Sequence, residues 1–324
     1  MSAPRKRRAL SSATLSDLGE NRLVAELTRH LALGADVRCG AGDDCAVIGH
    51  PRAARWQLLK ADAVIEGVHF LPAEDPRRVG WKALCRAISD IAAMGGMPAH
   101  ALITIAAPPA TPAARLRGIY AGLRRAARSF DVSIVGGETA RSPGAIFINV
   151  ALTGWVERTR CVFRSGGLAG DALYVTGRLG GSLAGRHLDF TPRLAEARWL
   201  VEHAKIHAMM DLSDGLAADL PRLASASHCG YELFHDRLPL ALGCTPDQAL
   251  ADGEDYELLF AVAARDAAKL ESKWRKQFPK LAITRIGTLR SSQLSPRHHG
   301  LLAKPRISTL NSQLPRGFDH FPQR

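Results

Sequence analysis

The chain has 324 residues, 46% of them hydrophobic, which is enough material for about two cores. Its net charge of +12 favours polyanionic ligands such as ATP or weak nonspecific contact with nucleic acid, although solubility is the plainer explanation. No apolar run is long enough to span a membrane, and no zinc-finger, basic-zipper or aromatic RNA-binding pattern is present, which argues against a membrane protein and a sequence-specific nucleic-acid binder.

The N-terminus and the cysteines indicate the compartment. Residues 1–15 begin with the basic run Pro4-Arg5-Lys6-Arg7-Arg8 and continue into Ser and Thr, which predicts a disordered basic tail instead of a signal peptide. The six cysteines form no C-x-x-C pair and no zinc spacing, and most of them lie among apolar residues. A cytoplasmic protein with reduced, buried thiols is therefore expected.

Helical and extended patterns are mixed along the chain. Apolar spacing predicts helices over 16–33, 76–94 and 112–129. Apolar runs predict strands near 45–49, 57–65, 101–107, 132–135, 145–154 and 172–176. The Gly-rich segment Arg164–Asp171 is a predicted hinge, after which a second set of strands and helices runs to about residue 290. The end, 291–324, is rich in Pro, Arg, Ser and His and is expected to be mostly irregular.

The segment Met210–Leu216 places two carboxylates and a hydroxyl where an apolar strand becomes a helix. Asp214 is a candidate cap for that helix, and a cap needs only one acceptor. Asp211 and Ser213 then remain beside a helix N-terminus, a position that suits Mg²⁺ and the phosphates it bridges. Taken alone, an ordinary capped turn explains the segment equally well.

Acidic residues recur in or beside the other apolar runs. The further examples are Asp43-Asp44, Asp62, Ser89-Asp90, Glu138 and Glu254-Asp255-Tyr256-Glu257. Such acids are costly to bury unless they are paired or bound to a cation. Their repetition in a chain with 43 Lys+Arg and 31 Asp+Glu indicates a shared metal site, although any one of them could be a solvated loop acid.

The helix predicted over 76–94 has an apolar stripe of Leu84, Ile88 and Ile91. Asp90 lies on a different face, among small residues that would admit a close neighbour or a ligand. On periodicity alone, the favoured arrangement is a surface Asp90 paired with Arg86 one turn earlier.

Eight motifs, in order between about residues 16 and 321, resemble those of the thiamine-monophosphate kinase family. They are Gly42-Asp43-Asp44-Cys45-Ala46; Asp62 with Glu66-Gly67-Val68-His69-Phe70-Leu71-Pro72; Lys82-Ala83-Leu84 with Ser89-Asp90-Ile91-Ala92-Ala93-Met94-Gly95; Gly136-Gly137-Glu138-Thr139 with Arg141-Ser142; Arg164-Ser165-Gly166; Asp211-Leu212-Ser213-Asp214-Gly215-Leu216; Gly253-Glu254-Asp255-Tyr256-Glu257-Leu258; and Gly317-Phe318-Asp319-His320-Phe321. Looser relatives of the same ATP-binding superfamily are aminoimidazole ribonucleotide synthetase, selenophosphate synthetase and a hydrogenase-maturation dehydratase.

The resemblance implies an α/β subunit with two domains, which we place at residues 16–160 and 161–324. The N-terminal α/β domain would form a β-barrel with its twin across a homodimer interface, and the C-terminal domain would be α+β. The implied activity is ATP-dependent phosphorylation of thiamine phosphate to thiamine diphosphate, by direct in-line transfer of the γ-phosphoryl group assisted by several Mg²⁺ ions. A catalytically altered binding protein, or a sister enzyme with another acceptor, is the alternative.

Matching motif positions imply the roles of individual residues. The metal-binding acids would be Asp44, Asp62, Asp90, Glu138, Asp211 and Asp214. ATP would contact Gly137, Arg164 and Ser213, with Tyr120 stacking on or flanking the nucleotide. Thiamine phosphate would bind His69, Glu254 and Phe318, where Phe318 offers an aromatic face to the thiazolium cation and Glu254 a counter-charge. No covalent or general-base residue is expected, because the acceptor oxygen is already anionic.

Three features depart from the family pattern. Lys60-Ala61 stands where Ser-Thr usually precedes the strand aspartate, and Glu138 stands where Asp is usual. The segment between Gly180 and His187 is shorter than expected in a region that could form a lid. Lys60 shares a strand face with Asp62, so its ammonium is expected to take the place of one outer Mg²⁺ and to pair with Asp62 or Asp44.

Overall fold

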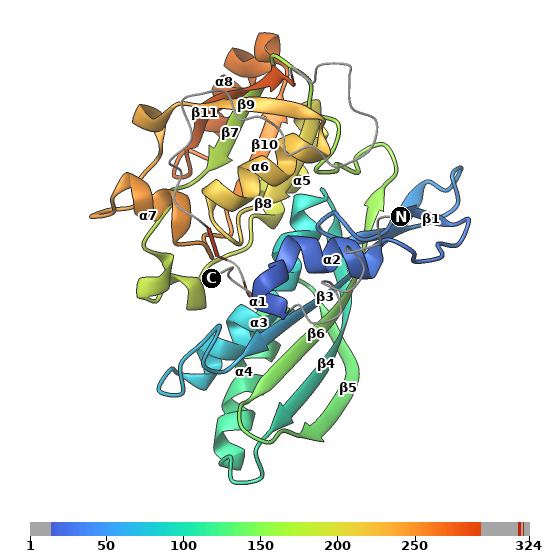
Figure 1. The fold of residues 1–324 in the computed structure, drawn as a ribbon, viewed down its shortest axis with the longest axis vertical. Helices are drawn as coiled ribbons and strands as arrows, with labels where there is room; N and C mark the ends of the chain where they lie inside the picture. Colours follow the sequence, from blue (N-terminus) through green and yellow to red (C-terminus); the bar gives the residue numbers. More distant parts are fainter. Residues whose placement is uncertain (1–13, 293–316, 319, 321–324) are drawn as a thin grey trace, which may run out of the picture.

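The computed structural model describes residues 14–292, 317–318 and 320 (Figure 1). Most of the predicted basic tail and of the predicted irregular end falls outside these residues. Two β-sheets with their covering helices form the described part. No described helix combines the length and the apolar character that crossing a membrane requires. All six cysteines are free thiols.

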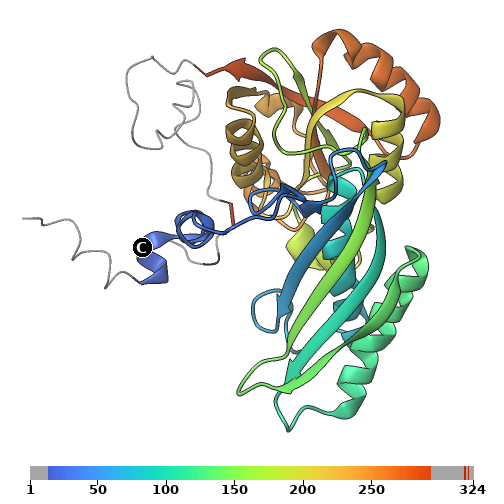
Figure 2. The ribbon, with the colours of Figure 1, turned by 90° about the vertical axis from the view of Figure 1, so that its right-hand side faces the viewer.

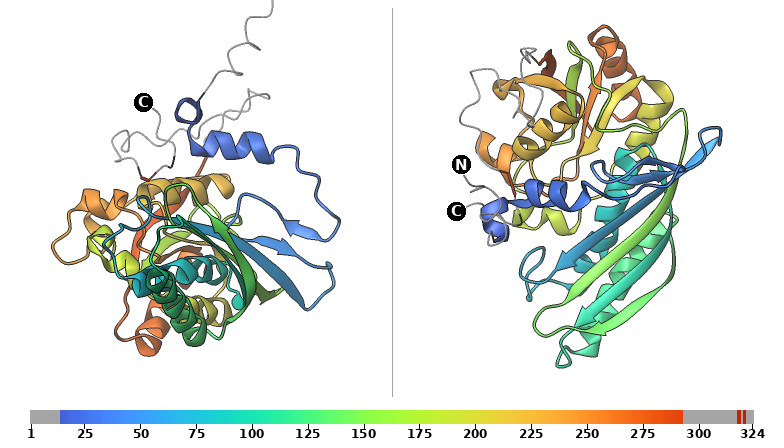
Figure 3. Two further views of the ribbon diagram at one scale, coloured as in Figure 1. Left: turned by 90° about the horizontal axis from the view of Figure 1, so that it is seen from below. Right: turned by 45° about the vertical axis from the view of Figure 1, so that its right-hand side comes forward.

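Two short helices replace the single helix predicted over 16–33. They are α1 (Leu15–Leu18) and α2 (Glu20–Thr28), and neither has a buried residue. The break falls at Gly19, whose φ of 71° a helix cannot continue through. Figure 3 shows both helices at one side of the molecule, outside its two layered halves.

The first sheet has six strands in the order β1-β2-β3-β6-β4-β5. Only β4 and β5 pair in parallel. The strands are β1 (Val37–Cys39), β2 (Ala46–Ile48), β3 (Arg55–Ile65), β4 (Met97–Ala107), β5 (Ser133–Arg141) and β6 (Phe147–Glu157). Strand β5 is longer than predicted, because its pairing with β4 continues to Arg141, so the Gly136-Gly137-Glu138 motif lies within this edge strand and does not follow it.

Helices α3 (Pro76–Ala93) and α4 (Ala113–Ser129) cover one face of the first sheet (Figure 2). The two helices approach closely at Gly80 and Gly122, where an added Cβ would lie 1.9 Å from a carbonyl oxygen of the other helix. The predicted apolar stripe of α3 is confirmed, since Leu84, Ile88 and Ile91 are fully buried. Strand β6 alternates between buried and partly exposed residues, which is the pattern of a sheet covered on one face.

The second sheet is antiparallel, in the order β8-β10-β7-β11-β9. Its strands are β7 (Ala172–Thr176), β8 (Ile206–Asp211), β9 (Cys229–Leu233), β10 (Leu258–Val262) and β11 (Ile283–Ser291). All residues of β7 and β10 are buried, because helices pack on both faces. One face carries α5 (Leu194–His203) and α8 (Ala267–Gln277), and the other carries α6 (Leu216–Ala226) and α7 (Pro246–Ala251).

Helix α3 connects the two halves of the structure. One hydrophobic cluster includes its buried side chains, the inner residues of the first sheet and the α5–α8 face of the second sheet. Two 3-10 turns, Ser182–Ala184 and Arg186–Leu188, occupy the short segment near Gly180. The domain boundary near residue 160 stays a prediction.

Candidate active site

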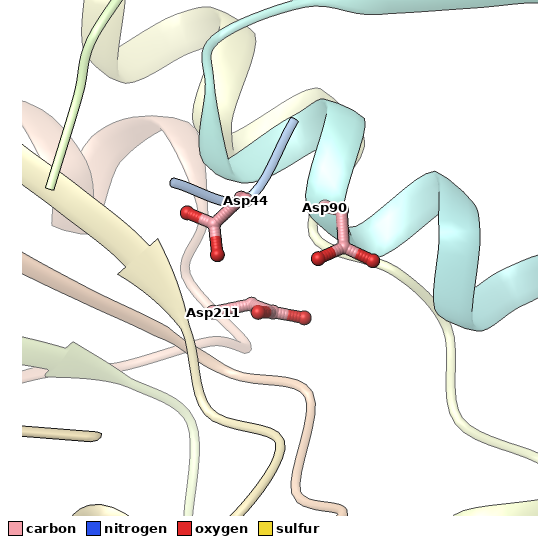
Figure 4. A group of neighbouring side chains, drawn as sticks. All are labelled: Asp44, Asp90 and Asp211. Carbon is pink, nitrogen blue, oxygen red and sulfur yellow. The ribbon is translucent and has the colours of Figure 1, made fainter. Parts of the chain in front are cut away.

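Three buried carboxylates converge where α3 meets the second sheet (Figure 4). Asp44 lies in the turn before β2, Asp90 near the end of α3, and Asp211 at the end of β8. One oxygen from each lies within 4.8 Å of the others. The structure thus brings together three of the six acids predicted to bind metal, although they are separated by up to 167 positions in the chain.

Protein hydrogen bonds occupy some, but not all, of the oxygens in this cluster. Asp44 Oδ1 accepts a hydrogen bond from Arg164 Nη2 at 2.5 Å, and Asp211 Oδ2 accepts one from the Ser89 hydroxyl at 2.6 Å. Asp44 Oδ2 is buried and has no hydrogen-bond partner among the described residues. A buried carboxylate oxygen without a partner is costly, and clustered carboxylate oxygens are the ligands that Mg²⁺ prefers. The donor set therefore fits a magnesium ion.

Burial and mutual repulsion raise the proton affinities of several acids in and beside the cluster. Burial raises the pKa of Asp90 well above its usual range, and the lysine Lys60 only partly opposes this effect. Burial and the nearby Asp44 charge raise the pKa of Asp211 to about 7. Burial and Asp44 likewise raise the pKa of Asp43 to about 7. A divalent cation would remove the mutual repulsion that contributes to these shifts.

Lys60 forms an ion pair inside the site, but with a different acid from those predicted. Its Nζ donates to Asp90 Oδ1 at 2.7 Å, and not to Asp62 or Asp44. The pairing occurs because α3 packs across β3 and brings Asp90 over the strand. Asp90 is consequently buried, so the surface pairing with Arg86 that periodicity favoured is wrong. Lys60 and Asp90 instead form a contact between the two elements.

The other three predicted metal ligands lie outside this cluster. Asp62 faces Arg86, with 3.5 Å between Oδ2 and Nε. Asp214 is ion-paired with Arg222. Glu138 is exposed on the edge strand β5. Their roles as metal ligands stay predictions.

The turn between β8 and α6 is held by an aspartate that the sequence did not single out. Asp214 does not cap the helix; the helix begins after Gly215, which offers no side chain for capping. The fully buried Asp219 instead accepts hydrogen bonds from the backbone N–H groups of Ser213 and Asp214, at 3.1 and 3.0 Å. Arg222 Nη1 also donates to Asp219 at 2.8 Å.

A pocket of about 130 Å³ opens beside the acidic cluster. All three residues predicted to bind thiamine phosphate line it: His69, Glu254 and Phe318. The remaining lining residues are Val68, Arg86, Leu183, Ser213, Asp214, Asp252, Tyr256 and His320. The sequence thus predicted residues from three separate motifs that the fold brings into one pocket.

Backbone geometry and buried cations fix Glu254 in this pocket. Glu254 itself has a φ of 52°, and its N–H donates to Ser213 O at 2.7 Å. Its Oε2 accepts from Lys82 Nζ at 2.6 Å and lies 2.8 Å from His187 Nδ1. Burial alone would raise the pKa of Glu254, but the hydrogen bond with His187 and the Lys82 charge lower it to about 2. Glu254 is therefore a carboxylate at neutral pH.

Lys82, the lysine that is ion-paired with Glu254, is fully buried. Besides Glu254, it donates to the carbonyl oxygen of His69 at 2.5 Å, so it connects two pocket residues. Burial lowers the pKa of Lys82 to about 8, although Glu254 opposes the shift. Lys82 and Arg86 precede Asp90 by eight and four positions, a spacing that places all three along one helix face and that could have indicated their roles.

The predicted ATP-binding residues are less closely grouped. Arg164 contacts Asp44, and its backbone N–H donates to the Asp43 carboxylate at 3.1 Å. Ser213 lines the pocket. Gly137 lies within β5, and Tyr120 is a half-buried residue of α4 that packs against the core. Nucleotide contacts of these four residues stay predictions.

Comparison with known proteins identifies the family. Residues 42–156 match the family model of the N-terminal domain of AIR synthase related proteins, and residues 182–294 match that of the C-terminal domain. A thiamine-monophosphate kinase of Rhodopirellula baltica is 37% identical over 303 residues, covering 88% of this chain and 92% of the relative. The chain belongs to the thiamine-monophosphate kinase family. The kinase of Aquifex aeolicus, 33% identical over 86% of this chain and 94% of its own length, agrees.

Solved structures support the same membership. The structure of AaThiL complexed with AMPPCP and TMP is 31% identical, has a TM-score of 0.77, and covers 96% of this chain and 99% of that chain. The mixed α/β fold with two domains is therefore confirmed for this kinase-family chain. Family membership also confirms the identification made from the eight motifs and the assignment as a kinase.

Proposed function

We propose that this protein transfers the γ-phosphoryl group of ATP in line to thiamine phosphate, giving thiamine diphosphate. The observation that carries the proposal is the position of the acidic cluster beside the pocket. Ser213 and Asp214 line the pocket two and three positions after Asp211, and Arg86 lines it four positions before Asp90. A phosphate acceptor held in the pocket would thus meet a nucleotide bound at the acids. The relative AaThiL is complexed with AMPPCP and TMP in its solved structure.

Clustered Mg²⁺ ions are part of the proposal. Asp44, Asp90 and Asp211 would hold magnesium, which when bound neutralises the repulsion between the ATP polyphosphate and the acceptor phosphate. Ser89 orients Asp211 through its hydroxyl, and Arg164 fixes one oxygen of Asp44. Further metal contacts from Asp62, Glu138 and Asp214, and nucleotide contacts from Gly137, Arg164, Ser213 and Tyr120, belong to the same proposal.

Thiamine phosphate would bind with its cationic ring near Phe318 and Glu254. Phe318 is 41% exposed at the pocket and is tied to it by a hydrogen bond from its N–H to Asp214 O at 3.0 Å. An aromatic face and a carboxylate together suit a ring that carries a permanent positive charge. Because Lys82 and His187 hold the Glu254 carboxylate, its position is set before the substrate arrives.

A homodimer is proposed from the face of the first sheet that no described helix covers. This face carries an apolar groove of about 470 Å³, lined by Leu59, Lys60, Ala61, His100, Leu102, Val135, Ala151, Leu152 and Thr153. Leu102 and Val135 are 48% and 60% exposed. A second copy packed on this face would bury them and form the predicted barrel. Sedimentation of the wild type and of Val135→Asp tests the dimer, which the variant should weaken.

The activity is tested by supplying the purified protein with ATP, Mg²⁺ and either thiamine phosphate or thiamine. We expect ADP and thiamine diphosphate to form in equal amounts with thiamine phosphate only. The alternative of a binding protein without efficient transfer is motivated by the Lys60–Asp90 ion pair, which places a lysine charge on a predicted metal ligand. If thiamine phosphate binds but no ADP appears at any Mg²⁺ concentration, the protein is a binding protein and the proposed kinase activity is wrong.

A further inference from the structure

Arg86 is a buried cation in the pocket, and the roles assigned above leave it unexplained. Its side chain is 12% exposed, and it lines the pocket together with His69, Glu254 and Phe318. One terminal nitrogen, Nη1, donates to the Ala63 carbonyl oxygen at 3.1 Å. Nε is buried and has no hydrogen-bond partner within the described part of the chain.

An arginine in such surroundings is poorly satisfied. A guanidinium group carries five N–H donors in a planar fork. The cost of burying its charge is offset only when good hydrogen-bond acceptors surround these donors. The nearest carboxylate oxygen, Asp62 Oδ2, is 3.5 Å from Nε, which is too far for a strong charge-assisted bond. Arg86 therefore lines the pocket with at least one N–H donor, on Nε, that has no hydrogen-bond acceptor among the described residues.

The position of Arg86 along α3 indicates what those donors meet. Lys82, Arg86 and Asp90 follow one another at intervals of four residues, about 6 Å apart along the helix axis. Lys82 holds Glu254 at the end proposed for the thiazolium ring, and Asp90 belongs to the acidic cluster at the end proposed for the ATP phosphates. Arg86 stands between these two ends, in the stretch that the proposed arrangement gives to the phosphate of thiamine phosphate.

We infer that the Arg86 guanidinium binds the phosphate group of thiamine phosphate and so makes the pocket select phosphorylated thiamine over thiamine. The inference rests on the proposed function and adds a binding residue to it. A planar guanidinium matches two phosphate oxygens at once, whereas a lysine ammonium acts as a point charge. Asp62 balances the charge while the pocket is empty, and the phosphate supplies the missing acceptors.

The test compares two ligands that differ only in the phosphate. Dissociation constants for thiamine phosphate and thiamine are measured by titration calorimetry on the full chain, for wild type and Arg86→Met. We expect the variant to bind thiamine phosphate about ten- to a hundredfold more weakly, the range for lost charge-assisted hydrogen bonds, and to bind thiamine as the wild type does. Equal weakening for both ligands, or no change, would overturn the inference.

Arg198→Met is the matched control. Arg198 is 13% exposed, donates to the Gly95 carbonyl oxygen and pairs with Glu157, but lies outside the pocket. Its loss should lower stability without changing the ratio of the two affinities. Arg86→Lys keeps the positive charge but lacks the planar fork, so it should also weaken binding of thiamine phosphate selectively, by a smaller factor. This variant serves as the test if Arg86→Met does not fold. If wild-type protein releases no ADP and binds no thiamine phosphate, the proposed function itself fails.

Discussion

Replacing Lys60 by Met removes the ammonium from the acidic site while keeping a side chain of similar length. In the structure Lys60 Nζ lies 2.7 Å from Asp90 Oδ1, and the two side chains are 21% and 9% exposed. At this distance and an effective dielectric of about 20, the attraction is about 6 kcal/mol, most of which desolvation cancels. Breaking such a pair costs about 3–5 kcal/mol when it is fully buried, so we expect about 2–4 kcal/mol here.

Magnesium should reverse much of this loss. In Lys60→Met the Asp90 carboxylate has no lysine partner and stays beside Asp44 and Asp211, so the folded state gains affinity for a cation. Binding to the folded state alone stabilises it in proportion to the logarithm of ligand concentration. The free energy of urea unfolding, measured from chelator-treated protein to millimolar Mg²⁺, should therefore rise more steeply in the variant than in the wild type.

Two further variants sharpen this experiment. Lys60→Arg keeps the positive charge and should follow the wild-type curve. Restoring the family pattern with Lys60→Ser and Ala61→Thr should steepen the Mg²⁺ dependence of ADP release, because it restores oxygen ligands beside Asp62. If Lys60→Met unfolds with the same free energy and the same Mg²⁺ response as the wild type, the reasoning that Lys60 stands in for a metal ion is refuted.

Other residues of the site give further expected outcomes. Asp211→Asn should lower turnover by more than a hundredfold with an unchanged circular dichroism spectrum, since a lost metal ligand removes several kcal/mol of charge stabilisation; near-wild-type turnover would rule out the proposed cluster. Phe318→Ala should raise the KM for thiamine phosphate about fivefold or more, and a selective loss of ATP affinity would place Phe318 at the nucleotide instead. Burial lowers the pKa of His69 to about 4, and protonation would break the hydrogen bond that Ile65 N–H donates to its Nδ1. Because this pKa lies below the unfolded value of about 6.5, the His69 contribution to stability is present above pH 6.5 and is lost as the pH falls to 4, by up to about 3 kcal/mol. Urea unfolding of wild type and His69→Gln across this range should show the difference, and parallel curves would contradict it.

Local patterns were sufficient for much of the fold and for the main members of the site. The helix predicted over 76–94 is α3, because its apolar spacing and its Asp75 cap act within a few residues. The strand before Asp211 was placed for the same reason. Motif matching then supplied what periodicity could not, the convergence of His69, Glu254 and Phe318 in one pocket.

Partners across elements could not be predicted from the sequence. The role of Asp219 could not be predicted, because Asp219 lies inside a helix and accepts from N–H groups five and six residues earlier. A capping residue is ordinarily expected just before the helix. The extension of β5 to Arg141 depends on pairing with β4 and has no signal in a segment that contains two glycines. The acid paired with Lys60 likewise depends on how α3 crosses β3.

That crossing explains why two unusual cations occur together. Lys60 and Asp62 are two residues apart on β3, a separation of about 7 Å, while Arg86 and Asp90 are four apart on α3, about 6 Å. The matching separations let two ion pairs form across the interface, Lys60 with Asp90 and Arg86 with Asp62. Losing either cation alone would leave an aspartate facing the acidic cluster without a cationic partner. With both present the two cations balance the two aspartates, so under the proposed function we expect this site to need fewer Mg²⁺ ions than a site without Lys60 and Arg86.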